Sequence, residues 1–97
     1  MNDSKQQLIN QCNRICEEIE AGGDVVEYLN DILDYEYMVS NKKEYIGSRI
    51  LVAFGGPNIY INTRSNVVEG YWGGDEIERS YNDGMGVDAY MCELYEN

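Results

Sequence analysis

The chain of 97 residues contains no histidine, and its seven lysines and arginines face eighteen aspartates and glutamates. Without imidazole it lacks the usual general base, the usual nitrogen ligand for metals and the side chain that titrates near neutral pH. A formal net charge of −11 opposes binding to nucleic acid or to an anionic membrane surface, because phosphate groups are bound by cationic side chains. The composition therefore directs the search for a function toward basic partners.

Long apolar runs are also missing from the sequence. No stretch approaches the roughly 18–20 apolar residues that a membrane span needs, and the first residues do not resemble a signal peptide. Three cysteines cannot all pair within one chain, and Cys12 and Cys16 stand four apart, as packed side chains of one helix would. We therefore expect a reduced, cytoplasmic protein, with residues 1–97 in a single domain and with no cofactor or metal site.

The first third of the chain carries two apolar patterns at helical spacing. The first covers residues 5–20 and ends at glycines 22–23, which suit the position just past a helix. The second covers residues 25–36, with Asp24 as its expected N-cap. The sequence predicts a helical hairpin, while residues 35–39 remain open between the fraying end of the second helix and a short strand.

The middle of the chain has the composition of an antiparallel meander. Turn residues separate the expected strands, and strands joined by such short turns run antiparallel. The expected strands cover residues 49–54, 59–63 and 67–72, with residues 76–81 open as a further edge strand or a loop. Apolar residues within 87–94 recur at helical spacing, which predicts a short C-terminal helix.

The predicted fold class is α+β, with an N-terminal helical hairpin, a three- to five-stranded antiparallel meander sheet and a short C-terminal helix. Helices must cover one face of the sheet, because a lone meander cannot bury it. The residues expected on that covered face are Ile50, Val52, Phe54, Ile59 and Ile61.

Acidic side chains gather at the two ends of the chain. Residues 1–36 and 69–97 each have a net charge of −7, whereas residues 37–68 have +3. Three carboxylates recur three to four residues apart on the expected second helix, which places them roughly 5 Å apart along its axis. That spacing is comparable to the spacing of phosphates along a nucleic-acid strand. These residues are Glu27, Asp31 and Asp34.

A second acidic group, formed by Asp75, Glu76 and Glu78, is the other candidate for partner binding. The sequence also has nine tyrosines, more than a core of this size can hold, and tyrosine is common at interfaces. Tyr35, beside the first acidic group, is included in the candidate surface for this reason. Two alternatives stay open: the acidic groups are solvated faces that aid solubility, and Tyr60, Tyr71 and Trp72 pair across strands.

A resemblance to known proteins is carried by residues 45–73. The segments Gly55–Thr63, with the sequence GGPNIYINT, and Val68–Trp72, with the sequence VEGYW, resemble a segment of small proteins from plasmids, conjugative elements and phages of low-GC Gram-positive bacteria. The short, acidic, histidine-free chain is also similar in style to the anti-CRISPR and anti-restriction proteins of such elements. The resemblance implies an inhibitor that occupies the basic channel of a nuclease, and it assigns no functional residue.

We therefore expect a non-enzymatic acidic protein that blocks nucleic-acid binding by a basic partner, a CRISPR nuclease above all, through phosphate-mimicking carboxylates. Direct contact with nucleic acid or membrane is not expected. The alternative is a regulatory or antitoxin-like interaction module of a mobile element, which could act as a homodimer. An enzyme is disfavoured because the chain offers no evident base, nucleophile pair or metal set.

Overall fold

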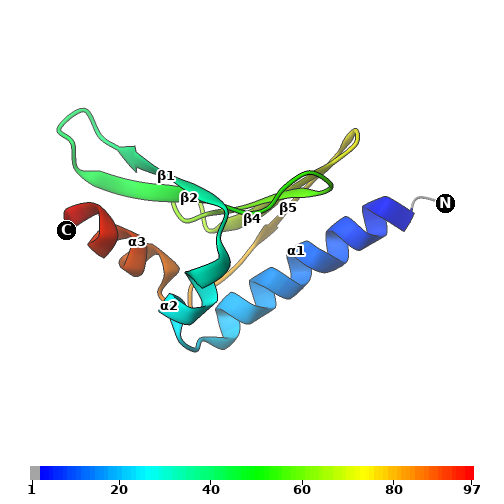
Figure 1. Cartoon of the computed structure of the whole chain (residues 1–97), viewed down its shortest axis with the longest axis horizontal. Helices are drawn as coiled ribbons and strands as arrows, with labels where there is room; N and C mark the ends of the chain where they lie inside the picture. Colours follow the sequence, from blue (N-terminus) through cyan, green and yellow to red (C-terminus); the bar gives the residue numbers. More distant parts are fainter. Residues whose placement is uncertain (1–2) are drawn as a thin grey trace.

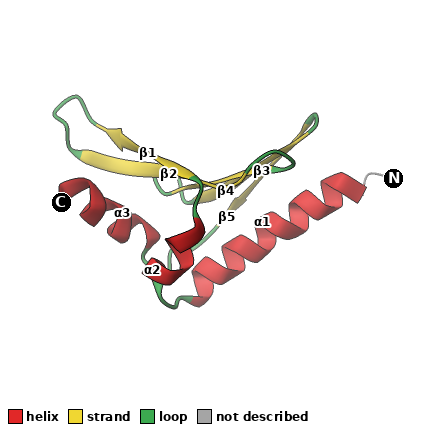
Figure 2. Cartoon of the chain, viewed as in Figure 1, coloured by secondary structure: helices red, strands yellow, loops and turns green. Residues whose placement is uncertain are grey.

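The computed structural model describes residues 3–97. Its helices and strands follow the chain in the order expected of an α+β protein, so that prediction is confirmed (Figure 2). The elements are α1 (Asp3–Ala21), α2 (Val25–Tyr28), the 3-10 turn η1 (Leu29–Asp31), β1 (Asp34–Val39), β2 (Tyr45–Ala53), β3 (Asn58–Asn62), β4 (Val67–Trp72), β5 (Asp75–Ser80) and α3 (Val87–Glu96).

The five strands form one sheet in the order β1-β2-β3-β4-β5, and each strand is antiparallel to its neighbours. This is the meander predicted from the sequence. The segments 35–39 and 76–81, whose conformation the sequence left open, form the two edge strands. All three helices lie on one side of the sheet, and the opposite side carries no helix (Figure 1). The sheet therefore has one covered face and one open face.

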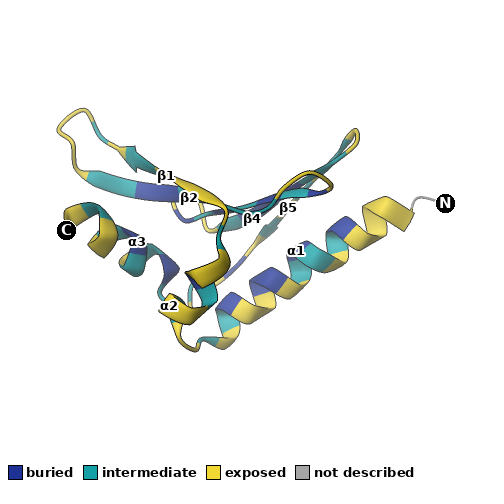
Figure 3. Ribbon diagram, viewed as in Figure 1, coloured by how far each residue is buried: buried dark blue, intermediate teal, exposed yellow. Residues whose placement is uncertain are grey.

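The hydrophobic core lies between the helices and the covered face of the sheet (Figure 3). Helix α1 packs on β4 and β5, while α3 packs on β2. At the centre of this contact, a Cβ atom on Gly70 would lie 2.7 Å from both the sulfur of Cys12 and Cδ1 of Leu8. Glycine at this position of β4 thus lets α1 lie directly on the sheet.

The second helix is much shorter than the predicted 25–36. Asp24 does cap it, because its side chain accepts hydrogen bonds from the backbone N–H groups of Val26 and Glu27. The helix ends at Tyr28, and the chain is extended by Ile32. The residues from Asp34 onward instead pair with β2, since their alternating pattern suits a strand and pairing satisfies their backbone groups.

The predicted covered face of the sheet is correct at four positions, including Val52, which packs partly buried against the core, and wrong at one. Ile50, Ile59 and Ile61 are fully buried, whereas Phe54 is 73% exposed. The register of β2 against β3 shifts between Leu51 and Ala53, so the alternation that begins at Ile50 does not continue to Phe54. A β-bulge of this kind cannot be read from a pattern of period two.

Helix α3 is attached to the sheet by a cluster of polar side chains. The hydroxyl groups of Tyr45 and Thr63 both donate hydrogen bonds to Oδ1 of Asp88, at 2.7 and 2.8 Å. Just before the helix, the Asp83 carboxylate accepts hydrogen bonds from the backbone N–H groups of Gly86, Val87 and Asp88.

Over residues 3–97, no helix combines the length and apolar character needed to cross a membrane.

Candidate functional site

The open face of the sheet is the most distinctive surface of the described chain. Because side chains alternate between the two faces of a strand, the strand register assigns every residue to one face. Gly70, which faces α1, fixes which set is covered. The open face carries Asp34, Glu36, Met38, Gly47, Arg49, Leu51, Asn58, Tyr60, Asn62, Val67, Glu69, Tyr71, Glu76, Glu78 and Ser80.

Two pairs of exposed carboxylates flank this face. Asp34 and Glu36 lie on the edge strand β1, and Glu76 and Glu78 lie on the opposite edge strand β5. Within a pair the residues are about 6–7 Å apart along the strand, and four strand spacings place the two pairs roughly 19 Å apart along the sheet. None of the three glutamates has a hydrogen bond or an ion pair within residues 3–97.

The centre of the open face holds a charge pair that is neutral overall. Arg49 donates two hydrogen bonds to Oε1 of Glu69, at 3.0 and 2.8 Å, and its guanidinium stacks 3.6 Å from the centre of the Tyr60 ring. Glu69 also accepts hydrogen bonds from the side chains of Asn62 and Tyr71. Burial raises the pKa of Glu69, but the hydrogen bonds from Asn62 and Arg49 outweigh it and hold the pKa below its usual value.

The open face is therefore strongly negative. Arg49 is the only base among its fifteen strand residues, against five acids, and Glu69 neutralises that base. No other lysine or arginine of the five strands lies on this face to oppose the four flanking carboxylates. Like charges held together in this way carry a repulsive cost, which a basic partner would relieve.

Aromatic rings lie between the two carboxylate pairs. The rings of Tyr60 and Tyr71 meet edge to face, with centroids 6.2 Å apart, so the expected pairing of these two tyrosines across strands is confirmed. Both rings remain partly exposed. The surface thus combines negative charge at its edges with aromatic rings around a neutral charge pair at its centre, and aromatic residues with arginine are enriched in protein-binding patches.

The structure brings three of the seven predicted binding residues together on the open face: Asp34, Glu76 and Glu78. It does not place Asp34 on a helix with Glu27 and Asp31, because α2 ends before Asp34 and that carboxylate lies on β1. The predicted helical row of three carboxylates is therefore wrong. Glu27 and Asp31 lie on the helical side of the molecule and are exposed.

Asp75 and Tyr35 point away from the open face, because each alternates with an open-face residue of its strand. The ring of Tyr35 contacts that of Tyr37, with centroids 5.4 Å apart, and Tyr37 contacts Tyr95 of α3. Tyr45 completes this group through contacts with both Tyr37 and Tyr95. Tyr35, which was expected on the binding surface, thus belongs to a tyrosine cluster that joins α3 to the sheet.

The sequence interpretation did not nominate Glu36 and Glu69. Glu36 could have been found, because Asp34 and Glu36 share one face as soon as residues 34–39 form a strand. Because a helix was predicted for this segment, the shared face of Asp34 and Glu36 was not recognised. The role of Glu69 depends on Arg49, its partner two strands away, and no local pattern signals it.

The described residues contain no cluster of three or more Cys, Asp or Glu side chains that could hold a metal ion. No family model, no curated protein and no solved structure matches the chain, so comparison with known proteins assigns it to no family. What the open face offers chemically is a set of carboxylates and aromatic rings that could bind cationic groups.

Proposed function

We propose that the protein is a non-enzymatic inhibitor that binds a basic nucleic-acid-binding protein through the open face of its sheet and so excludes the nucleic acid. One observation carries the proposal: Asp34, Glu36, Glu76 and Glu78 are exposed on one face of the sheet, and the only base that its strands place there is already neutralised by Glu69. These carboxylates would occupy the positions at which the partner binds phosphates.

The aromatic rings at the centre of the face support the same function. Charge–charge contacts alone give fast but weak, salt-sensitive association, because exposed ion pairs contribute about 0–1 kcal/mol each. Tyr60 and Tyr71 would add aromatic area that packs against the partner or stacks on its arginines. The two contributions together suit a stable inhibitor.

The partner class we propose to examine first is the CRISPR nuclease of a bacterial host, within whose cytoplasm an inhibitor from a plasmid or phage would act. Such nucleases hold nucleic acid in a positively charged channel and read a short flanking duplex with arginines. The resemblance of residues 45–73 to proteins of mobile elements motivates this choice.

The experiment measures DNA binding by a guide-loaded type II CRISPR nuclease in the presence of the purified protein. The test variant combines Asp34→Asn, Glu36→Gln, Glu76→Gln and Glu78→Gln. The matched control combines Asp3→Asn, Glu17→Gln, Glu93→Gln and Glu96→Gln, which removes the same charge from exposed positions of α1 and α3.

We expect the wild-type protein and the control to block DNA binding, and the test variant to need at least about tenfold more protein for the same effect. Inhibition by the wild type should also weaken as salt rises from 50 to about 300 mM. Equal inhibition by both variants would mean that the binding site does not lie on the open face. Lack of inhibition across several basic nucleic-acid-binding proteins would refute the function.

The alternative of a homodimeric interaction module has less support. Such a module would pair through the free edges of the sheet, and both edge strands carry exposed carboxylates that repel a second copy. Analytical ultracentrifugation at low and high salt separates the two functions. A dimer that persists at low salt would favour the module.

A further inference from the structure

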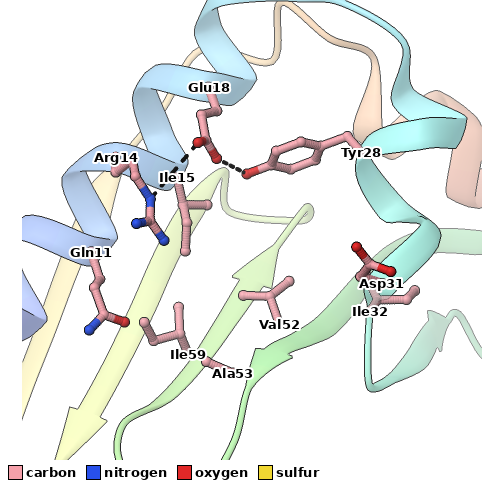
Figure 4. Close-up of a pocket in the computed structure, with 10 residues that line it drawn as sticks. All are labelled: Gln11, Arg14, Ile15, Glu18, Tyr28, Asp31, Ile32, Val52, Ala53 and Ile59. Carbon is pink, nitrogen blue, oxygen red and sulfur yellow. Dashed lines mark hydrogen bonds and ion pairs between the residues drawn. The ribbon is translucent and has the colours of Figure 1, made fainter.

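A cavity lies on the helical side of the molecule, where α1 and the α2–η1 segment diverge above β2 and β3 (Figure 4). Its volume is about 320 Å³. This is near the lower end of the roughly 300–1,000 Å³ of ligand pockets, so it suits a single large side chain better than a cofactor.

The floor of the cavity is apolar. Five of its ten lining residues are aliphatic, and in Figure 4 they surround the hollow from the helix, the sheet and the segment after η1. These residues are Ile15, Ile32, Val52, Ala53 and Ile59. Only Ile15 and Ile59 are buried, so the other three keep apolar surface in contact with water that an inserted side chain would cover.

The rim is held in shape by a bridge between α1 and α2. The hydroxyl of Tyr28 donates a 2.7 Å hydrogen bond to Oε1 of Glu18, and Nε of Arg14 lies 3.8 Å from Oε2 of the same carboxylate (Figure 4). Burial and the Glu18 carboxylate both raise the pKa of Tyr28, so its hydroxyl stays a donor. The only base that lines the cavity is thereby engaged by Glu18.

A second, shallower hollow adjoins the first, and the two share Tyr28 and Asp31 as a common wall. The second hollow is acidic, since Asp24, Glu27 and Asp31 are among its lining residues and no lysine or arginine is. Asp24 is occupied as the cap of α2, whereas Glu27 and Asp31 are exposed. An apolar cavity thus leads directly into an acidic hollow.

We infer that the two hollows together form a docking site for a peptide segment of a protein partner in which a large aliphatic side chain is flanked by arginine or lysine. The aliphatic side chain enters the cavity between Ile15 and Val52, and the cation lies over Glu27 and Asp31. The site faces away from the open face of the sheet, so it does not depend on the function proposed above.

Three capped peptides test the inference: acetyl-Arg-Leu-Arg-amide, acetyl-Arg-Gly-Arg-amide and acetyl-Glu-Leu-Glu-amide. Binding to the full chain is followed by NMR, using the methyl resonances of Ile15, Ile32 and Val52. We expect the first peptide to shift these resonances in a saturable way. The glycine peptide should bind at least about tenfold more weakly, because it lacks the buried side chain, and the acidic peptide should not bind.

Two variants localise the effect. Ala53→Leu fills the cavity and should abolish binding, with thermal unfolding used to verify that the fold is retained. Asp31→Asn leaves the cavity intact and should weaken binding about two- to fivefold, the effect expected of one exposed ion pair. Glu93→Gln on α3 removes the same charge elsewhere and should have no effect.

Absence of saturable shifts for the first peptide, or equal binding of the leucine and glycine peptides, would overturn the inference. Binding that neither Ala53→Leu nor Asp31→Asn alters would overturn it too. The peptide assay uses no nuclease, so its outcome is separate from that of the inhibition assay.

Discussion

The hydroxyl of Tyr45 on β2 lies 2.7 Å from Oδ1 of Asp88 on α3, although the two residues are 43 positions apart in the chain. The same hydroxyl lies 2.9 Å from the hydroxyl of Ser48, and Thr63 also donates to Asp88. This cluster is the main polar link between the C-terminal helix and the sheet. Because few side chains of α3 are buried, these hydrogen bonds help to hold the helix against the sheet.

Tyr45→Phe should lower the free energy of unfolding by about 1–3 kcal/mol, because a hydrogen bond to a charged carboxylate is lost. Urea unfolding followed by circular dichroism measures the change. Tyr60→Phe is the control, since the Tyr60 hydroxyl has no hydrogen bond in the described structure, and it should stay within about 0.5 kcal/mol of wild type. Similar losses for both variants would contradict the role of Tyr45.

Gly70→Ala should destabilise the protein by about 1–3 kcal/mol, because the added methyl group meets Cys12 and Leu8 at 2.7 Å and pushes α1 off the sheet. Thermal unfolding gives the measurement. Gly74→Ala is the matched control, as nothing lies within 4 Å of the atom it would add. If Gly70→Ala unfolds at the wild-type temperature, α1 does not approach β4 as closely as described.

Glu69 should make stability depend on pH in the acid range. Its pKa is lower in the folded protein than the usual value of 4.5, so its stabilising contribution is present near neutral pH and is lost as the pH falls below about 4.5. Glu69→Gln should be less stable at pH 7 and should lose less stability between about pH 5 and 3 than wild type. Urea unfolding across this range tests it, and equal pH slopes for Glu69→Gln and wild type would contradict the role of Glu69.

The three thiols should differ in reactivity. Cys12 and Cys16 are fully buried, and burial, with a smaller contribution from Cys16, raises the pKa of Cys12 to about 11. Cys92 on α3 is partly exposed. A disulfide reagent at pH 8 should therefore modify one thiol per native molecule and all three after unfolding. In a Cys92→Ser variant the native protein should show no fast reaction; rapid modification of Cys12 or Cys16 would contradict the packing of α1.

Much of the fold was predictable because local patterns and long-range packing agree there. The spacing of Leu8, Cys12 and Ile19 predicts a helix with one apolar face, and that face is buried against the sheet. The alternation around Ile50 and Ile61 predicts strands with one buried face. In these segments the residue pattern alone predicts which face is buried.

The prediction failed where a local pattern was ambiguous between two structures. Residues 25–36 fit a helical spacing, but Asp34 and Glu36 also alternate with Tyr35 and Tyr37 as in a strand. The outcome depended on β2, whose backbone groups were available for pairing with this segment. No property of residues 25–36 alone could decide between the two.

The sequence by itself determined the net charge, the absence of histidine, the α+β order of elements and the acidic character of both ends. Only the tertiary structure decided which carboxylates share a surface. Asp34 and Glu78 are 44 residues apart, yet antiparallel pairing places both in one row across the open face, while Asp75 turns to the other side. The physical reason is that strand register, which is set by contacts between distant segments, fixes the direction of every side chain on the sheet.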